Sequence, residues 1–569
     1  MTSSKVYTND SPINFDSILW SDIWNYLFTN LQLKRNNNEN LIELKTHLTN
    51  RISMVQRELS KPTSMVNDYL QWVRSHHKNI KMVTKPIPLS ILGSNVREGE
   101  LIDVRISCRG PDDKYYDRDP LLRQRLPRGC TLINCDLKDE KDKRLDFGLF
   151  ALRKFTGGLG DDDDRQEDNR AWLNYFLIHP HDAKQIICTQ KINGEAAHLS
   201  CFSLNNRLIL CAGSKNVHLC FRNHSDIDLY GNDVCYSYAS SFCHTILNTL
   251  SKMSDHGAML LNFLCETRYT AIFEILNYAH QHVVNLEYLK DSASELKFIT
   301  FSEVPQNFDS VVTNLCSLPP DYSIEIARCL HLSTTNYDII ENKQDILNEY
   351  LLSIKYRHEC EGSVLYFLDD NDRVVGLLKK KTIWYVILRA IREKTRPMCS
   401  HWEKSRKMDL SETLSKTEKR LCEIQGWLKY SDEILKCWTD LACQFIKWLS
   451  NEIKKKTISV KDISDHYPIV WTKFLNETNS NDNFMTKYMN NLTSNDNVWK
   501  QLNEIKTSSI TTKDQYTSRQ GRKTKQPSGD VTVADDDNVD INVRSLHLFD
   551  KEESDTVEDE EKSDQDDNK

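Results

Sequence analysis

The sequence has no apolar segment of the roughly 20 residues that a membrane-spanning helix requires. The N-terminal residues, Met1 to Lys5, do not begin a hydrophobic signal segment. Seventeen cysteines are present, but their spacing is irregular and none forms a CxxC pair. These absences argue against a membrane protein and a secreted disulfide-rich protein, and nothing points to a zinc site. We therefore expect an intracellular protein, in the cytoplasm, the nucleus or both, with reduced thiols.

The net charge is small, −8, and it is unevenly distributed. Residues 528–569 hold 16 acidic and 4 basic side chains, a net charge of −12, which leaves +4 for residues 1–527. A mildly basic body is compatible with a polyanionic substrate but does not establish one. A short apolar island at 546–549, within the acidic segment, is a candidate site for a tail-binding protein.

The pattern of apolar residues divides the chain into four regions. Apolar side chains at helical spacing predict an N-terminal helical region over 1–85 and a C-terminal helical domain over 395–475. Between them, 86–394 alternates strands with helices. Residues 476–569 are rich in Asn, Ser, Thr and Asp and predict a disordered acidic tail. The fold class is therefore α+β, with antiparallel sheets flanked by helical regions.

Within the central region, residues 86–185 are expected to be irregular, with short strands. A helix is expected over 236–252, and residues 306–358 are predicted to be helices around a break at Pro319 and Pro320. Strands are expected over 130–135, 186–190, 196–204, 208–212, 271–276, 283–288, 296–301, 361–368 and 373–382.

Lys191 lies between two of these predicted strands, an unusual place for a charge. Lysine is rarely buried without a partner, but near other cations or in an apolar setting its neutral amine is a nucleophile. Gly194 follows closely and would let backbone and ligand approach each other. Taken alone, a surface lysine beside an Asn-Gly turn is the simpler interpretation.

A second group of charges lies on a predicted hairpin. Glu361 opens one strand, and the returning strand ends in Lys379, Lys380 and Lys381. Because side chains alternate along a strand, Lys379 and Lys381 project to one face and Lys380 to the other. Two lysines on one face beside Glu361 are typical of a phosphate clamp, whereas a surface lysine cluster is the simpler alternative.

Five further residues suit a nucleotide site. Glu274 is a carboxylate inside an apolar strand, where it requires a partner or a purpose. Lys215 follows a strand in the sequence Gly-Ser-Lys. Arg128 precedes a glycine, and Lys154 and Phe155 precede a pair of glycines. Basic and aromatic side chains beside glycine can hold a nucleotide, and a basic turn is the alternative.

The order of these elements resembles the covalent nucleotidyltransferase superfamily of ligases and capping enzymes. The similarity is greatest to phage-type RNA ligases and to the ligase module of fungal tRNA ligases, and it covers residues 125–390. The five motifs that carry it are Lys191-x-Asn193-Gly194, Gly213-Ser214-Lys215, Phe273-Glu274-Ile275, Glu361-Gly362-x-Val364 and Lys379-x-Lys381-Thr382-x-Trp384-Tyr385-Val386. The expected core is therefore an ATP-grasp-like ligase fold.

Upstream, the segments at Arg128 and Lys154 resemble the Arg-Gly and Lys-Phe-Phe elements of these ligases. Two positions depart from the pattern. Thr156 stands where the family often has a second phenylalanine, which puts adenine stacking there in doubt, and Asn193 replaces the more usual aspartate.

The resemblance implies a role for each residue. Lys191 would attack the α-phosphate of ATP and form a lysyl-AMP. Lys379 and Lys381 would face the phosphate charge that develops, and Glu361 would bind Mg²⁺ or Mn²⁺ directly or through water. The residues expected to contact the nucleotide are Arg128, Lys154, Phe155, Asn193, Gly194, Lys215, Glu274, Glu361, Lys379 and Lys381.

The function that the resemblance implies is ATP-dependent joining of RNA 5′-phosphate and 3′-hydroxyl ends, in RNA repair or tRNA-type splicing. DNA ligase and mRNA guanylyltransferase are less favoured, because they carry a C-terminal OB-fold where this chain is predicted to be helical. A non-catalytic RNA-binding scaffold with this fold is the other alternative. The sequence has no P-loop and no pair of His-x-Thr motifs, so end healing would require separate end-processing enzymes.

Overall fold

The computed structural model describes residues 20–484, except for 36–37, 60–63, 109–111, 139–142, 158–170, 206, 232–233, 293, 306, 309 and 406–408. All of the described residues belong to one compact unit, and a second unit, Arg109–Pro111 with Ser494–Lys569, lies outside them. The division of the chain into four regions therefore stays a prediction.

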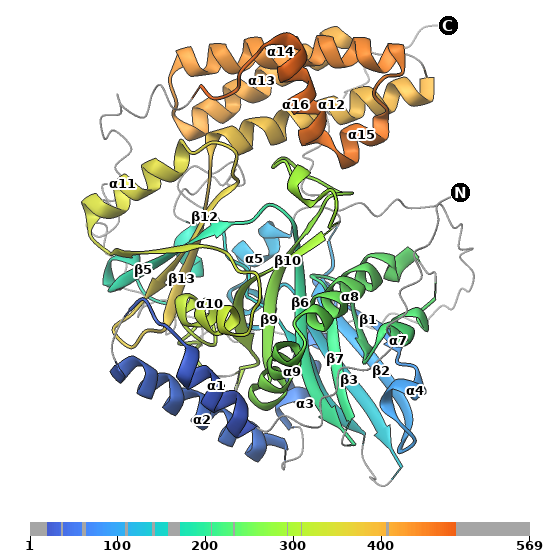
Figure 1. The fold of residues 1–569 in the computed structure, drawn as a ribbon, viewed down its shortest axis with the longest axis vertical. Helices are drawn as coiled ribbons and strands as arrows, with labels where there is room; N and C mark the ends of the chain where they lie inside the picture. The colour runs from blue at the N-terminus through green and yellow to red at the C-terminus, as the bar shows by residue number, and fades with distance from the viewer. Residues whose placement is uncertain are drawn as a thin grey trace, which may run out of the picture. The chain divides into compact units, whose positions relative to one another are not determined.

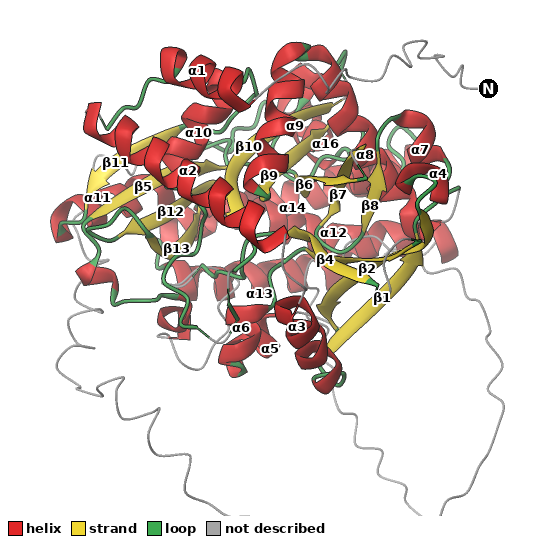
Figure 2. Cartoon of the chain, turned by 90° about the horizontal axis from the view of Figure 1, so that it is seen from below, coloured by secondary structure: helices red, strands yellow, loops and turns green. Residues whose placement is uncertain are grey.

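Three antiparallel sheets occupy the centre of the described fold, and helices cover them (Figures 1 and 2). The strand orders are β1-β2-β3-β4, β10-β9-β6-β7-β8 and β11-β5-β12-β13. The strands are β1 (Ile80–Pro86), β2 (Val96–Ile106), β3 (Cys130–Leu137), β4 (Arg144–Phe150), β5 (Gln185–Lys191), β6 (Glu195–Leu204), β7 (Arg207–Ser214), β8 (His218–Phe221), β9 (Tyr269–Asn277), β10 (Ser294–Glu303), β11 (Tyr337–Glu341), β12 (Gly362–Leu368) and β13 (Val374–Lys381).

The described helices precede, connect and follow these strands. They are α1 (Trp20–Asn30), α2 (Asn38–Leu59), α3 (Ser64–Ser75), α4 (Leu89–Leu92), α5 (Asp113–Arg118), α6 (Pro120–Arg125), α7 (His224–Asp228), α8 (Val234–Lys252), α9 (Asp255–Thr267), α10 (Pro320–Cys329), α11 (Gln344–Lys355), α12 (Ile383–Ser405), α13 (Leu410–Leu428), α14 (Asp432–Lys455), α15 (Val460–Asp465) and α16 (Tyr467–Thr478). The predicted α+β class, with antiparallel sheets and a helical C-terminal region, is confirmed.

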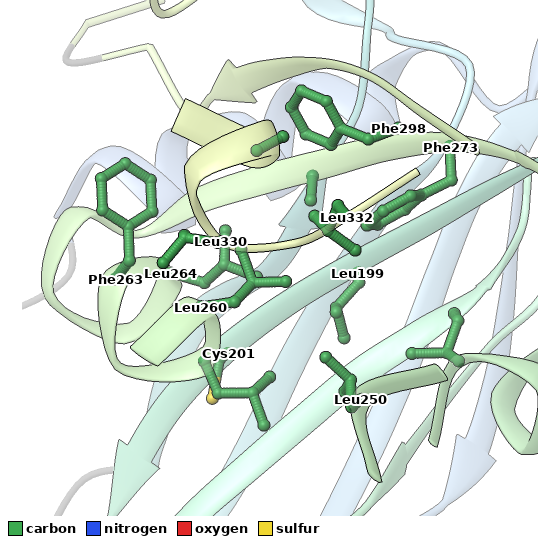
Figure 3. Close-up of a cluster of buried hydrophobic side chains, with 14 of the residues drawn as sticks. Leu199, Cys201, Leu250, Leu260, Phe263, Leu264, Phe273, Phe298, Leu330 and Leu332 are labelled. Carbon is green, nitrogen blue, oxygen red and sulfur yellow. The ribbon is translucent and has the colours of Figure 1, made fainter. Parts of the chain in front are cut away.

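The largest apolar core lies between the second sheet and helices α8 and α9. Leu199 and Cys201, alternate residues of β6, face Leu260 and Leu264 of α9 in Figure 3. Helices α1 and α2 add their apolar stripes to the same cluster and pack on α9 and α10. This core holds the second sheet, which begins just after Gly194.

Helices α12–α16 form a separate apolar cluster, seen at the top of Figure 1. Aromatic side chains dominate it: the ring of Phe445 lies 4.9 Å from Trp471 and 5.3 Å from Phe474, measured between centroids. Such tilted and edge-on aromatic contacts are favoured over face-to-face stacking. We refer to these five helices as the C-terminal bundle.

Strands β1, β2, β4 and β8 were not predicted individually, and a buried ion pair disguises the first two. Residues 86–185 were expected to be irregular, yet β2 runs for 11 residues, and β1 lies in the region predicted to be helical. Lys85 of β1 and Asp103 of β2 form an ion pair of 2.6 Å, and both side chains are 2% exposed. A charged residue in a strand interior looks solvent-facing in a sequence, although its partner on the next strand makes burial possible.

Two other expectations were wrong. The predicted strand at 283–288 is a loop that ends in a 3₁₀ turn at Glu287–Leu289. Strand β11 lies within residues 306–358, which were predicted to be helical throughout. Both segments are short and apolar, and periodicity alone does not distinguish such segments.

The described chain also continues beyond the predicted start of the tail at 476. Helix α16 ends at Thr478, and Asp482 is buried: it accepts hydrogen bonds of 2.9 Å from both Trp384 Nε1 and Trp471 Nε1. The rest of the predicted tail, with its apolar island, lies outside the described residues. Within the part of the chain that is described, no helix has the length and apolarity to cross a membrane.

Candidate active site

Lys191 ends β5 and lies in line with a second lysine across the third sheet. It pairs with Gly362 of β12, and Gly362 pairs in turn with Lys381 of β13. Residues paired directly across antiparallel strands project to the same face, so the side chains of Lys191 and Lys381 share a face. Lys379, two residues before Lys381, projects to that face as well.

Lys380 projects to the opposite face, as the alternation predicts, because it pairs with Ser363 rather than with Gly362. Lys380 and Lys381 are only 7% and 4% exposed, and Lys379 is half-buried. The alternative of a surface lysine cluster is therefore wrong. All three lysines are at least partly buried, and buried ammonium groups require anionic or polar partners.

Gly362 lies on the strand between Lys191 and Lys381, and only glycine fits at this position. Its φ is +146°, and a Cβ there would lie 1.9 Å from the carbonyl oxygen of Lys380. Because Gly362 places no side chain between the two lysines, strand β12 contributes nothing beyond its backbone between Lys191 and Lys381.

Glu361 forms the direct partner of Lys191. Its Oε1 lies 2.6 Å from Lys191 Nζ, and the Glu361 side chain is 5% exposed against 24% for Lys191. The carboxylate comes from the residue just before β12, whose backbone pairs with the end of β5. The lysine is thus open to solvent on one side and held by a buried carboxylate on the other.

Asn193 joins this ion pair to a neighbouring loop. Its Nδ2 donates to Glu361 Oε2 (3.2 Å) and to the hydroxyl of Tyr385 on α12 (3.3 Å). Its Oδ1 accepts from the backbone N–H groups of Val283 (3.1 Å) and Val284 (3.0 Å). Tyr385 also faces Lys381, whose Nζ lies 5.9 Å from its ring centroid.

Glu274 approaches the same site from β9. Its Oε1 accepts a 3.1 Å hydrogen bond from the backbone N–H of Gly194. Burial raises the pKa of Glu274 to about 7; nearby Glu361 adds to the rise and Lys191 opposes it. Gly194 is required here, because a Cβ would meet the carbonyl oxygen of Ile275 at 2.3 Å.

Arg128 and Lys154 are brought together by two aspartates that the sequence did not single out. Arg128 pairs with Asp112, and Lys154, 4% exposed, pairs with Asp113 and lies 3.7 Å from Asp112. Burial lowers the pKa of Lys154, as do the charges of Arg128 and Lys379, while the carboxylates oppose this shift. The two basic residues are therefore already held by carboxylates, which an incoming phosphate would have to replace.

The segment that carries Lys154 runs alongside β13. Thr156 bridges to Leu378, and Thr156 O accepts from Lys379 N at 3.2 Å. Phe155 is partly buried against the apolar side chains of the third sheet. Lys154 and Lys379 are consequently neighbours, whereas Phe155 packs in a core and presents less of its ring to a ligand.

Lys215 makes no described contact with Lys191, Glu361 or Glu274. It follows β7, whose last residue, Ser214, pairs with Ala197, while Glu274 pairs with Ala196. Lys215 thus lies at the same end of the second sheet as Glu274. It makes no hydrogen bond or ion pair with another described residue.

A metal ion would require ligands in addition to the protein's own. In the described part of the chain, no group of three or more His, Cys, Asp or Glu side chains could hold one. Mg²⁺ bound to a nucleotide typically takes one or two carboxylates and completes its shell with phosphates and water. Glu361, paired with Lys191, and Glu274, which accepts from the adjacent Gly194 N, are two carboxylates of this site that suit that requirement.

Sequence reasoning missed the residues that hold the site together. Tyr385 stands within a recognised motif, but its contact with Asn193 spans 192 positions. Val283 and Val284 act through backbone N–H groups, which no side-chain pattern reveals. Asp112 and Asp113 belong to a polar stretch whose only sequence signal is their charge.

The chain is similar to one protein family and to several solved structures. The profile of a family described as "Domain of unknown function (DUF7920)" matches residues 100–392. No curated protein gives a significant sequence match. Similar solved structures include three mutants of Naegleria gruberi RNA ligase, one with AMP and Mn and two with ATP and Mn, at 10–12% identity and TM-scores of 0.24–0.25. Each match covers 54% of this chain and 97% of the RNA ligase chain.

Proposed function

The chain belongs to the DUF7920 family, and for it we propose the function of an ATP-dependent RNA ligase that works through a lysyl-AMP. One observation carries the proposal: Lys191 shares a sheet face with Lys379 and Lys381, across a glycine, and forms an ion pair with buried Glu361. A nucleophilic amine, a carboxylate and two further cations on one face suit attack on a phosphate.

In the first step the Lys191 amine attacks the α-phosphorus of ATP. The ammonium must first lose a proton, and Glu361 Oε1, at 2.6 Å, is within reach to accept it. A nitrogen–phosphorus bond forms, the bond from that phosphorus to the bridging oxygen breaks, and pyrophosphate leaves. The product is AMP joined to the lysine by a phosphoramidate.

The two other lysines stabilise this step. Negative charge grows on the phosphate oxygens as the nucleophile approaches, and fixed cations facing those oxygens lower the barrier. Lys379 and Lys381 are anchored on the β12–β13 hairpin, so they keep their position without reorganisation. When bound, Mg²⁺ or Mn²⁺ would neutralise phosphate charge, with Glu361 and Glu274 as its protein ligands.

The later steps move AMP and then release it. The 5′-phosphate of an RNA strand attacks the phosphorus of the adduct, the nitrogen–phosphorus bond breaks, and a phosphoanhydride forms. A 3′-hydroxyl then attacks the RNA phosphate and AMP leaves. Arg128 and Lys154, released from Asp112 and Asp113, would contact phosphates of the nucleotide.

The C-terminal bundle favours an RNA ligase over two related enzymes. DNA ligases and mRNA guanylyltransferases resemble this chain in the core but follow it with an OB-fold, which is a five-stranded barrel. From Ile383 to Thr478 the described residues form helices and contain no strand. A non-catalytic scaffold with the same fold is distinguished only by assay.

The proposed function is tested by strand joining. RNA with a 5′-phosphate and a 3′-hydroxyl is incubated with the protein, ATP and Mg²⁺, and the product is sized on a denaturing gel. A longer strand is expected with ATP, and none with RNA that has a 5′-hydroxyl. Joining of DNA alone, or labelling with GTP in place of ATP, would favour the other members of the superfamily.

A further inference from the structure

Every hydrogen-bonding position of the Asn193 side chain is occupied. The amide has two N–H groups, which donate to Glu361 and Tyr385, and an oxygen with two lone pairs, which accepts from Val283 N and Val284 N. Asn193 is 8% exposed. Two backbone donors fix which end of the amide is the oxygen, so the N–H groups must point at the Glu361 carboxylate.

The loop that binds the oxygen of Asn193 is itself attached to the C-terminal bundle. Val283 is 2% exposed and belongs to the apolar cluster of α12–α16. Gln281 N donates to Asp465 O of α15 at 2.7 Å, and its side chain accepts from Leu286 N at 2.8 Å. Figure 1 shows this connection between β9 and β10 reaching toward the bundle.

These contacts form one continuous series, from the bundle to the loop, from the loop to Asn193, and from Asn193 through Glu361 to Lys191. We infer that Asn193 is a positioning residue: it transmits the placement of the C-terminal bundle to the Glu361–Lys191 pair rather than contacting the nucleotide. This inference rests on the proposed function for the meaning of the pair, but its geometry can be tested without activity.

The two ends of the amide have separable tasks. The oxygen anchors the loop, and an aspartate at 193 would keep this task because its carboxylate accepts the same two backbone N–H groups. The N–H groups orient Glu361 in this chain, and an aspartate, the more usual residue of the ligases that it resembles, cannot perform that task, so the inference applies to this chain alone. Its charge would instead repel Glu361 across a gap that is now 3.2 Å, and the anchored Asp would oblige Glu361 to move.

Two variants exploit this difference. Hydrogen exchange of the peptide that holds Val283 and Val284 should remain slow in Asn193→Asp and become fast in Asn193→Ala. A crystal structure of Asn193→Asp should show Glu361 Oε1 displaced from Lys191 Nζ, from 2.6 Å to beyond hydrogen-bond distance. An unchanged Glu361–Lys191 contact in that variant would overturn the inference, whether or not the protein proves to be a ligase.

Kinetics separate positioning from the other roles. For a positioning residue, Asn193→Asp should lower the rate constant of self-adenylation by roughly tenfold or more, with the half-saturating ATP concentration unchanged. A higher half-saturating concentration would overturn it in favour of a nucleotide contact. A wild-type rate with a slowly exchanging loop would mean that Asn193 only anchors the loop.

The matched control is Lys290→Ala, on the same connection between β9 and β10. Lys290 is exposed and forms an ion pair of 3.3 Å with Glu287 of the same segment. It should leave the adenylation rate unchanged. If this control lowers the rate as much as Asn193→Asp, any disturbance of the loop is sufficient and the specific role of Asn193 is refuted. A wild-type protein that takes no label from ATP contradicts the proposed function, while the exchange and crystallographic results still decide the role of Asn193.

Discussion

Lys191 and Lys381 face the same side of one sheet, two strands apart, with only the backbone of Gly362 between them. Lys191 is partly exposed and paired with Glu361, whereas Lys381 is 4% exposed. Like charges on one face repel each other, and Glu361, 2.6 Å from Lys191 Nζ, offsets part of that repulsion. Under the proposed function, both lysines would also attract the phosphates of ATP.

The first prediction concerns the two lysines on that face. Lys379→Ala and Lys381→Ala should each lower the rate of self-adenylation by about 10²- to 10³-fold, the effect of removing one preorganised charge-stabilising group. The rate is measured by transfer of label from ATP to the protein under single-turnover conditions, with the folded state of each variant checked by circular dichroism.

Lys380 provides the control for that experiment. Its side chain projects to the opposite face, but it is 7% exposed, so truncation to alanine would disturb packing. Lys380→Met preserves most of the volume and removes the charge. We expect a lower melting temperature and a nearly unchanged adenylation rate at a temperature where the variant is folded. An equal loss of rate at all three positions would mean that the faces are assigned incorrectly.

The second prediction concerns Glu274 and the pH dependence of stability. Its pKa is raised from 4.5 to about 7, so the fold disfavours the charged form and loses stability as the pH rises through that range. Glu274→Gln mimics the protonated carboxyl and can still accept from Gly194 N. The variant should therefore unfold at a higher urea concentration than the wild type at pH 8 and at a similar concentration at pH 4.5. If the variant and the wild type differ in urea midpoint by the same amount at pH 8 and at pH 4.5, the raised pKa of Glu274 is contradicted.

The third prediction concerns Asp482, which joins the end of the described chain to the bundle. Asp482→Ala leaves the buried indole N–H groups of Trp384 and Trp471 without an acceptor, at a cost of roughly 1–3 kcal/mol for each unsatisfied group. Asp136→Ala, which removes an exposed pair with Arg97, should cost less than about 1 kcal/mol. Urea unfolding at pH 7 measures both values.

The same variant has a defined pH dependence. Burial opposes ionisation of Asp482, but hydrogen bonds from His358 and the two indoles outweigh it and lower its pKa. Its stabilising contribution is therefore complete above the unfolded-state pKa and is lost as the pH falls through the lower folded-state pKa. The difference between wild type and Asp482→Ala should narrow below about pH 4. A difference that widens on acidification would contradict the hydrogen-bond assignment.

Strands β5, β12 and β13 of the third sheet, with their lysines, could be anticipated from the sequence because their signals are local. Alternation along 373–382 is enough to separate Lys379 and Lys381 from Lys380, and the apolar run at 186–190 is enough to place Lys191 at a strand end. A one-residue change of register would have inverted every face, so the motif spacing carries strong information.

The parts that could not be anticipated depend on partners distant in sequence. Lys85 and Asp103 look like surface charges until they meet on adjacent strands, and the bonds between Asn193 and the Val283–Val284 backbone leave no trace in side-chain patterns. Asp482 is a single carboxylate in a polar stretch, and only the two indoles that it binds explain its burial. Local propensity carries no information about such contacts.

The central claim is that Lys191 is a covalent nucleophile toward ATP. The purified protein, incubated with α-labelled ATP and Mg²⁺ or Mn²⁺ without RNA, should acquire label that survives denaturation. The bond would be a phosphoramidate, labile to acid and stable to mild base. Lys191→Ala should remove the label and keep the fold, because a partly exposed side chain leaves no core cavity and Glu361 keeps its hydrogen bond from Asn193 Nδ2. Lys191→Arg should also fail, since a guanidinium stays protonated.

The most direct measurement is therefore the site of that label, determined by mass spectrometry of the digested adduct. The account predicts a single AMP on the peptide that holds Lys191, discharged when RNA with a 5′-phosphate is added. Label on another residue, label that persists in Lys191→Ala, or no label with either metal ion would contradict it.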